Sequence, residues 1–384
     1  MAKKSKQSDN TAMTDSLADD VLDIINRKFK EYQGAATFMT DANVVNAWCS
    51  SGCDILDLAI SNRPNGGFGY GTIVELFGLE GSGKSLLAAH IMSECQKEGG
   101  LAVLYDTEKA LGMLDFYKSL GLDVAKTIYT DKLRAVEEIY SSMEQIIEHT
   151  LKRNPDRKVV IVVDSLMGAS TLAELEGGYE KEGYATNKAI INSLAMRKIP
   201  SLIAGKNILI ILINQVRDNV NAVMFQEKHI TSGGKAIGFT ASTRCKLTKI
   251  GPITVTVDGS KIVIGEQVEV RIVKNRLGPP RRKVVLNILY DSGIDRYGSW
   301  LSLLKTLDCV KQSGSSYSYE YVDTSTGELI TKKFQSKDFK KLLTDNPELR
   351  DIIYQQICDS YIMKYDLGDE EFGIDDIVID TVEE

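Results

Sequence analysis

The sequence predicts an α/β fold in which helices flank a mostly parallel, twisted sheet that continues into an antiparallel extension. Between residues 36 and 294, short apolar runs rich in β-branched residues alternate with amphipathic stretches of helical periodicity. This alternation is typical of parallel strands that are covered on both faces. The later runs follow one another through turns such as Val257–Gly259, which indicates antiparallel strands.

The elements of the sheet are expected in a fixed order along the chain. The apolar runs that predict strands are 72–77, 101–105, 159–163, 208–213, 268–273 and 283–289. The stretches between the early strands that predict helices are 85–98, 133–151 and 185–205.

Both ends of the chain differ in composition from this core. A helix is expected from Ser16, which can serve as an N-cap, and its apolar stripe must pack on its own core or on a neighbouring subunit. After Trp300, short helices and a tyrosine-rich stretch indicate a small α+β lobe. The predicted domains are an N-terminal oligomerisation segment, the core, the lobe and an acidic disordered tail, with boundaries 1–35, 36–299, 300–363 and 364–384.

The charge of the chain is unevenly distributed. The 46 basic and 53 acidic residues among 384 give a formal net charge of −7. Nine of the acids and no Lys or Arg lie between Asp366 and Glu384, so the rest of the chain carries +2. Acidic terminal blocks are often solvated segments, and the net charge therefore does not exclude a nucleic-acid partner.

Composition and cysteine spacing restrict the compartment. Hydrophobic residues at 43% and charged residues at 26% exclude wholesale disorder. The six cysteines form no zinc-ligand set, the basic start is not followed by an apolar region, and the apolar runs are too short to span a bilayer. We expect a cytoplasmic protein with reduced thiols and no membrane partner.

A glycine-rich loop carries the strongest functional signal. The stretch after the first core strand fits G-x-x-x-x-G-K-[ST], and its residues are Gly78, Leu79, Glu80, Gly81, Ser82, Gly83, Lys84 and Ser85. In this strand–loop–helix context, backbone N–H groups surround nucleotide phosphates. Lys84 is expected to reach the β- and γ-phosphates, and the Ser85 hydroxyl to bind Mg²⁺.

Acidic residues at the ends of two further strands complete the nucleotide site. Asp164 directly follows the strand 159–163 and is placed to hold Mg²⁺ through water. The alternative interpretation is that Asp164 caps a helix beyond the strand. Hydrolysis needs a base for the attacking water, and Glu108 and Asp106 both follow the strand 101–105. Spacing alone leaves the choice between these two carboxylates open.

At this point several motifs together resemble the RecA recombinases. They are TIVELFGLEGSGKS at 72–85, TEKAL at 107–111, VVDS at 162–165, INQVR at 213–217, SGGKA at 232–236, VKNR at 273–276, ILY at 288–290, GI at 293–294 and DNPE at 345–348. The similarity runs in order from about residue 20 to 363, and the overall divergence looks like that of a phage-encoded member.

The resemblance implies catalytic roles and the cofactors ATP and Mg²⁺. Glu108 matches the family's catalytic glutamate, and Gln215 matches the glutamine that senses the γ-phosphate. Lys274 and Arg276 match a basic pair that a neighbouring subunit inserts against the phosphates, whereas without the family they read as two exposed strand charges. Phe116 matches the aromatic residue that stacks on adenine.

The resemblance also implies a DNA-binding surface. The segments 172–186 and 216–231, expected to be structureless, align with the family's first and second DNA-binding loops. The residues that match DNA contacts are Ser193, Arg197, Arg217, Val220, Gly233, Gly234 and Lys235. The methionine wedge of the family's first loop aligns near Ala185, so either Tyr184 replaces it by stacking or it is missing.

The leading interpretation is a DNA-dependent ATPase that forms a helical filament on single-stranded DNA and exchanges strands with homologous duplex, in recombination and DNA repair. Single-strand-binding and loader proteins are expected as partners. Two alternatives remain, a hexameric helicase with the same core fold and a P-loop small-molecule kinase. The N-terminal helix favours the filament, and the stretch from Gln215 to Lys235 argues against the kinase.

Overall fold

A computed structural model of the chain describes residues 16–30, 36–37, 45–109, 114–177, 184–218, 229–231, 234–322 and 327–363. The chain divides into two compact units, 1–44 and 45–384. In the first unit, α1 (Ser16–Lys28) is the predicted N-terminal helix. Its Asn26 side chain exchanges two hydrogen bonds with the backbone of Ala36. Leu17 on its apolar stripe is 67% exposed, so the described residues of this unit leave that part of the stripe uncovered.

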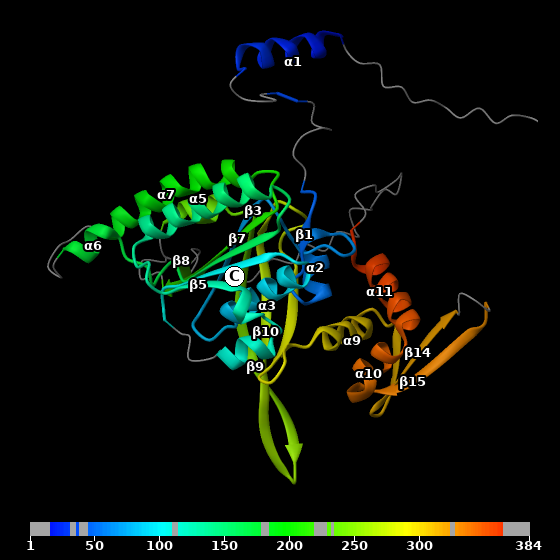
Figure 1. Ribbon diagram of the computed structural model, residues 1–384. Coiled ribbons are helices and arrows are strands. Elements are labelled where there is room, and N and C mark those ends of the chain that lie inside the picture. Colours follow the sequence, from blue (N-terminus) through cyan, green and yellow to red (C-terminus); the bar gives the residue numbers. More distant parts are fainter. Residues whose placement is uncertain are drawn as a thin grey trace, which may run out of the picture. The chain divides into compact units, whose positions relative to one another are not determined.

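The second unit is built on one large sheet, in the order β12-β11-β10-β9-β3-β7-β6-β4-β5, with β8 paired to β7 (Figure 1). The strands are β3 (Thr72–Gly78), β4 (Leu101–Asp106), β5 (Thr127–Thr130), β6 (Val159–Asp164), β7 (Ile208–Asp218), β8 (His229–Thr231), β9 (Thr243–Val257), β10 (Ser260–Asn275), β11 (Lys283–Leu289) and β12 (Gly293–Ile294). Strands β3, β4, β5, β6, β7 and β9 pair in parallel, and β9 to β12 pair antiparallel. The predicted α/β fold with an antiparallel extension is confirmed.

Helices cover both faces of this sheet. They are α2 (Asp54–Ser61), α3 (Lys84–Lys97), α4 (Leu114–Ser119), α5 (Val136–Arg153), α6 (Leu172–Glu176), α7 (Tyr184–Ile203) and α8 (Lys235–Thr240), with a 3₁₀ turn at Val124–Lys126 and a short hairpin of β1 (Trp48–Cys49) and β2 (Phe68–Gly69). Because side chains alternate along a strand, Val160 and Val162 pack with α2 and α3, whereas Ile161 packs with α5 and α7. The continuous apolar runs therefore bury both faces.

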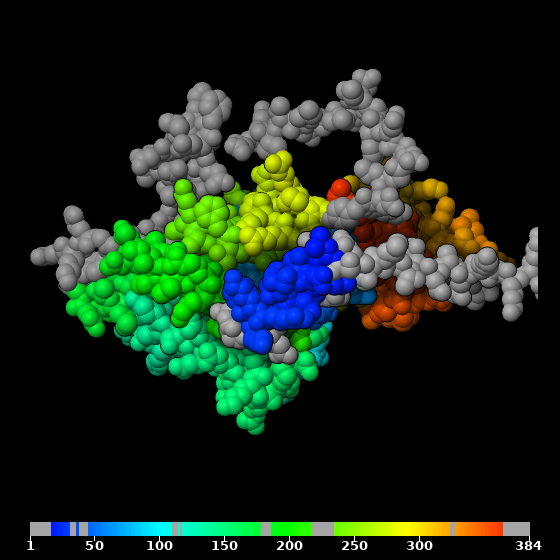
Figure 2. Space-filling view, turned by 90° about the horizontal axis from the view of Figure 1, so that it is seen from above, coloured from blue at the N-terminus to red at the C-terminus, as the bar shows by residue number. Residues whose placement is uncertain are grey.

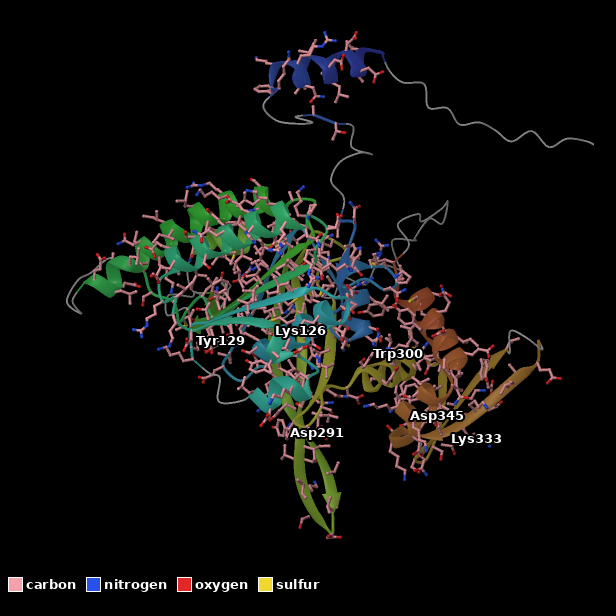
Figure 3. All side chains as sticks on the ribbon, in the orientation of Figure 1. Lys126, Tyr129, Asp291, Trp300, Lys333 and Asp345 are labelled. Carbon is pink, nitrogen blue, oxygen red and sulfur yellow. The ribbon has the colours of Figure 1, made fainter. Side chains whose placement is uncertain are left out.

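The C-terminal lobe shares its interior with the sheet. It consists of α9 (Arg296–Thr306), β13 (Val310–Ser313), β14 (Ser316–Val322), β15 (Leu329–Gln335), a 3₁₀ turn at Ser336–Asp338, α10 (Phe339–Asp345) and α11 (Pro347–Tyr361). Its buried side chains belong to the same apolar cluster as those of α2 and α3. Trp300, labelled in Figure 3, stacks on Tyr354 with ring centroids 5.5 Å apart. In Figure 2 the green helical layer and the orange lobe flank the yellow strands.

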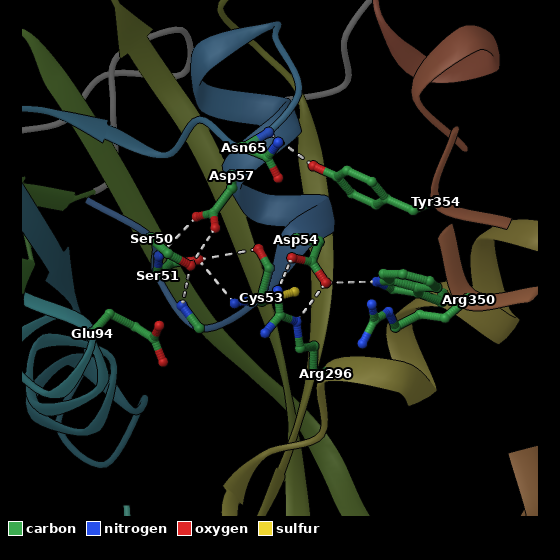
Figure 4. Close-up of polar contacts among 12 residues, drawn as sticks. Ser50, Ser51, Cys53, Asp54, Asp57, Asn65, Glu94, Arg296, Arg350 and Tyr354 are labelled. Carbon is green, nitrogen blue, oxygen red and sulfur yellow. Dashed lines mark hydrogen bonds and ion pairs between the residues drawn. The ribbon is translucent and has the colours of Figure 1, made fainter. Parts of the chain in front are cut away.

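Two buried carboxylates of α2 organise the junction with the lobe (Figure 4). Asp54 accepts hydrogen bonds from the Arg296 guanidinium (Nε at 2.6 Å) and from Trp300 Nε1 at 2.9 Å. Asp57 accepts from Ser50 Oγ at 2.5 Å and from the backbone N–H of Ser51 at 2.8 Å. Burial raises the pKa of Asp57 from 3.8 to about 7, against the effect of these hydrogen bonds.

The expectation that 172–186 and 216–231 are structureless is wrong in part. Residues 172–176 form α6, because Thr171 and Glu174 cap it reciprocally: each side chain accepts from the other's backbone N–H. Helix α7 already begins at residue 184, and β7 continues to residue 218, where it pairs with β8. The remaining parts, 178–183 and 219–228, and the predicted tail at 364–384 lie outside the described residues.

No helix in the described part of the chain has the length and apolar character needed to cross a membrane.

Candidate functional site

The phosphate loop connects the end of β3 to the start of α3. Gly81 (φ 69°) and Gly83 (φ 87°) take left-handed backbone angles that favour glycine. A Cβ on Gly78 would lie 2.2 Å from the carbonyl oxygen of Leu247 on β9, so this close approach also requires glycine. The first N–H groups of α3 have no intrahelical acceptor, and they therefore supply donors for an anion.

Lys84 points into this loop. Its Nζ donates to the carbonyl oxygens of Gly78 at 3.1 Å and Leu79 at 2.7 Å. Burial lowers the pKa of Lys84, while the nearby carboxylates of Asp164 and Glu108 oppose that shift. The loop thus holds the buried ammonium of Lys84 beside the first N–H groups of α3, which is the donor set that phosphates require.

Ser85 and Asp164 face each other across the start of α3. Burial raises the pKa of the Asp164 carboxyl to about 6 with help from the carboxylates of Glu108 and Asp106, whereas the nearby Ser85 hydroxyl opposes that shift. Mg²⁺ in nucleotide sites takes one or two protein oxygens together with phosphates and water. The hydroxyl and the carboxyl therefore fit the predicted Mg²⁺ site.

Glu108 and Asp106 differ in environment, although both follow β4. Asp106 is buried and accepts a hydrogen bond from Tyr129 OH at 3.1 Å. Glu108 is exposed, and its Oε1 accepts from Gln215 Nε2 at 2.9 Å and from Ser165 Oγ at 2.5 Å. The fold thus brings Gln215 to Glu108. Of the two carboxylates, that of Glu108 is the one that solvent can reach.

Lys274 and Arg276 lie at the carboxyl end of α8. Lys274 Nζ donates to the carbonyl oxygens of Gly238 at 3.0 Å and Phe239 at 2.6 Å, and Arg276 Nη2 donates to that of Phe239 at 3.0 Å. Burial lowers the pKa of Lys274, and the charges of Arg276 and Arg244 lower it further. The Phe239 side chain is 69% exposed. Phe239, whose carbonyl oxygen accepts from both cations, was not singled out from the sequence.

Three of the predicted DNA contacts lie on two helices that touch, α7 and α8. Ser193 and Arg197 are one turn apart on α7, and Arg197 is exposed. Lys235 begins α8, and a Cβ on the preceding Gly234 (φ 90°) would lie 3.0 Å from Ala189 Cβ on α7. The side chains of Phe116 on α4 and Arg217 on β7 are not among those described, and Val220 and Gly233 lie outside the described residues.

A buried network joins the strand before the phosphate loop to its neighbours. The fully buried Glu75 on β3 accepts from Asn214 Nδ2 at 3.0 Å and from Arg244 Nε at 2.5 Å. The Arg244 guanidinium lies 4.8 Å above the Phe77 ring. Sequence reasoning missed this network, although an acid in the apolar stretch TIVELFG was a visible signal.

Comparison with known proteins gives the family. The family model described as the RecA N-terminal domain matches residues 17–295. The chain belongs to the RecA family. Protein RecA of Syntrophobacter fumaroxidans is 33% identical over 83% of this chain and 86% of that protein. Protein RecA of Chloroherpeton thalassium is 34% identical over 84% and 83%, and that of Streptococcus pneumoniae is 32% identical over 80% and 74%.

The predicted resemblance to the RecA recombinases is thereby confirmed. At the level of the family, RecA membership supports a function in recombination and DNA repair, and it supports DNA-dependent ATPase activity with ATP and Mg²⁺.

Proposed function

We propose that this RecA-family chain polymerises on single-stranded DNA and catalyses homologous pairing and strand exchange, with ATP bound between protomers. One observation carries the proposal. Gln215 donates a hydrogen bond to Glu108 at 2.9 Å, and β7, which bears Gln215, leads directly into the predicted second DNA-binding segment. A change at the γ-phosphate that moves Gln215 would therefore reach the DNA-binding surface.

The residues of the nucleotide site have separate tasks in this proposal. Lys84 would exchange its carbonyl partners for the β- and γ-phosphate oxygens, and the loop N–H groups would hold the remaining oxygens. Mg²⁺, held by Ser85 and through water by Asp164, would neutralise phosphate charge. Glu108 would orient the attacking water and accept its proton, and Phe116 would stack on adenine.

The neighbouring protomer would complete the site with Lys274 and Arg276. The support is that both cations bond to main-chain carbonyls, and neither forms an ion pair with a carboxylate within the described ranges. Cations supplied in trans stabilise the charge of the transition state and make hydrolysis depend on assembly. The α1 stripe is proposed to dock on the adjacent protomer.

DNA would bind along α7, the end of β7 and the start of α8. Arg197, Arg217 and Lys235 would pair with phosphates, Ser193 and the N–H groups of Gly233 and Gly234 would donate to them, and Val220 would separate bases. Single-strand-binding and loader proteins are proposed as partners.

Mixing two inactive variants tests the shared site. Glu108→Gln removes the base and Lys274→Ala removes a trans cation, so each variant alone should lose turnover. In an equal mixture, roughly a quarter of the head-to-tail interfaces combine an intact Glu108 with an intact Lys274, and turnover should return to about that level. A mixture that stays inactive would refute the shared site.

DNA response and assembly test the rest of the proposal. ATP turnover should rise with single-stranded DNA, electron microscopy should show filaments, and a strand-exchange assay should give heteroduplex product. Closed rings would instead support a helicase-type motor, and turnover that is indifferent to DNA would support a small-molecule kinase.

A further inference from the structure

One oxygen of the proposed catalytic base is held from two directions. Glu108 Oε1 accepts from Ser165 Oγ and also from Gln215 Nε2. Gln215 precedes the second predicted DNA-binding segment, and Ser165 precedes the first. We propose that Ser165 is a positioning residue that restrains Glu108 from the first DNA-binding segment, so that both DNA-facing segments set the direction of the base. This inference rests on the proposed function.

Ser165 is tied to the Glu108 segment by more than its hydroxyl. Thr107 Oγ1 accepts from the Ser165 N–H at 3.0 Å and donates to the Ser165 carbonyl oxygen at 2.7 Å. The Thr107 N–H also donates to the carbonyl oxygen of Asp164 at 2.8 Å. Because Ser165 is only 1% exposed, its hydroxyl has little freedom to turn to water. Any movement of Ser165 is therefore transmitted to the exposed carboxylate of Glu108.

The segment after Ser165 is bound in turn to α7. Lys188 Nζ on α7 donates to the carbonyl oxygens of Met167 at 3.2 Å and of Ala169. The N–H of Gly168 donates to the Ser165 carbonyl oxygen at 3.2 Å. Helix α7 also carries Ser193 and Arg197, so a continuous bonded route runs from a DNA-facing helix through Lys188 and Ser165 to Glu108.

The two donors to Glu108 differ in what they can do when nucleotide binds. Gln215 is half-buried and would turn toward a γ-phosphate, which takes its N–H away from Glu108. The Ser165 hydroxyl then remains as the donor that orients the Glu108 carboxylate toward the attacking water. The fit is close, because a Cβ on Gly168 would lie 2.6 Å from Thr107 Oγ1 and 3.2 Å from Glu108 Cγ.

Lysine substitutions on α7 test the route. Lys188→Met should keep DNA-free ATP turnover within about twofold and lower turnover at saturating poly(dT) about tenfold, as expected for one lost charge-assisted hydrogen-bonded link. Lys198→Met is the matched control, because Lys198 lies on the same helix and pairs with Glu144 on α5; it should keep both rates. Fluorescence anisotropy establishes saturation for each variant. If poly(dT) raised the ATP turnover of Lys188→Met as much as that of the wild type, the proposed route through Lys188 would be refuted.

Substitutions at the hydroxyls test the positioning role. Ser165→Ala and Thr107→Val should lower kcat about tenfold with KM for ATP within about twofold, because the nucleotide contacts are untouched. Thr107→Ser, which keeps the hydroxyl, should restore kcat. Binding of a fluorescent ATP analogue identifies any variant that fails to fold, and a binding-competent Ser165→Ala with wild-type kcat would overturn the proposal. If wild-type turnover ignores DNA, the proposed function fails, whereas the effect of Ser165→Ala on DNA-free turnover still decides the role of Ser165.

Discussion

Arg244→Met tests whether the buried network around Glu75 holds three strands together. The Glu75 carboxylate is fully buried, and Arg244 donates to it at 2.5 Å with a side chain that is 24% exposed. Without the arginine, the donor to the Glu75 carboxylate that remains among the contacts of the described residues is the neutral amide of Asn214. Removing one partner of a buried pair costs about 3–5 kcal/mol. Methionine keeps the side-chain length over Phe77, so we expect the free energy of unfolding to fall by about 4 kcal/mol.

Urea unfolding followed by tryptophan fluorescence measures this loss. Trp48 reports on the hairpin next to α2, and Trp300 reports on the lobe junction. With an m value of about 3 kcal/mol/M, the midpoint should fall by about 1 M. Glu75→Gln combined with Arg244→Met removes both charges, and the double variant should recover at least about 2 kcal/mol relative to the sum of the single variants.

Arg296→Met is the matched control for Arg244→Met. Arg296 also binds a buried carboxylate, that of Asp54, but its side chain is 50% exposed. Solvent screens the charge of Arg296, and Asp54 keeps the Trp300 N–H as a donor. The free energy of unfolding should therefore fall clearly less for Arg296→Met than for Arg244→Met. Equal losses for the two arginine variants, or strict additivity in the double variant, would refute the reasoning.

Four further predictions concern separate parts of the chain. Asp57 binds its proton more tightly in the folded state, since its pKa rises from 3.8 to about 7; stability should therefore fall as pH rises through that range, and Asp57→Asn should flatten the dependence in unfolding curves recorded between these values. Glu108→Gln should bind ATP and form filaments without turnover, and normal phosphate release would contradict its role as the base. Lys84→Ala should abolish any nucleotide-dependent change in DNA binding, measured by anisotropy. Deletion from Asp366 should strengthen duplex binding and lower the Mg²⁺ needed for strand exchange, because a like-charged tail repels duplex through screened forces; unchanged duplex affinity at low salt would count against this.

Local patterns in the sequence predicted most, but not all, of the main elements of the sheet. Long apolar runs gave β3, β4, β6 and β7, and amphipathic periodicity gave α3, α5 and α7. Several elements were not predicted, among them the long strand β9 and the short elements α2, α4, α8 and β5. Helix α2 (DILDLAIS) is buried along its whole length, so even its polar residues do not form the solvent-exposed face that is typical of an amphipathic helix. Strand β5 has only four residues, of which Ile128 and Tyr129 are exposed.

The contacts that define the candidate site could only in part be predicted. The phosphate loop and Asp164 lie within contiguous motifs whose chemistry depends on local backbone geometry. Ser165 meets Glu108 across 57 positions, and Arg244 meets Glu75 across 169. Such pairs depend on strand order, which places β4 beside β6 and β3 beside β9. A motif does not say which of its side chains meet those of another motif, because a single sequence carries no direct record of strand order.

The shared interior of lobe and sheet limits how this chain can be divided. A fragment that ended at residue 299 would uncover the apolar side chains that α9 and α11 cover, and would leave the Asp54 carboxylate without the indole of Trp300. If the lobe were exchanged between relatives, α2 would have to be exchanged with it, or the residues on both sides of the contact between α2 and the lobe would have to change. The appendage is therefore not an interchangeable module, and recombination between genes at this boundary would be selected against through loss of the folded core.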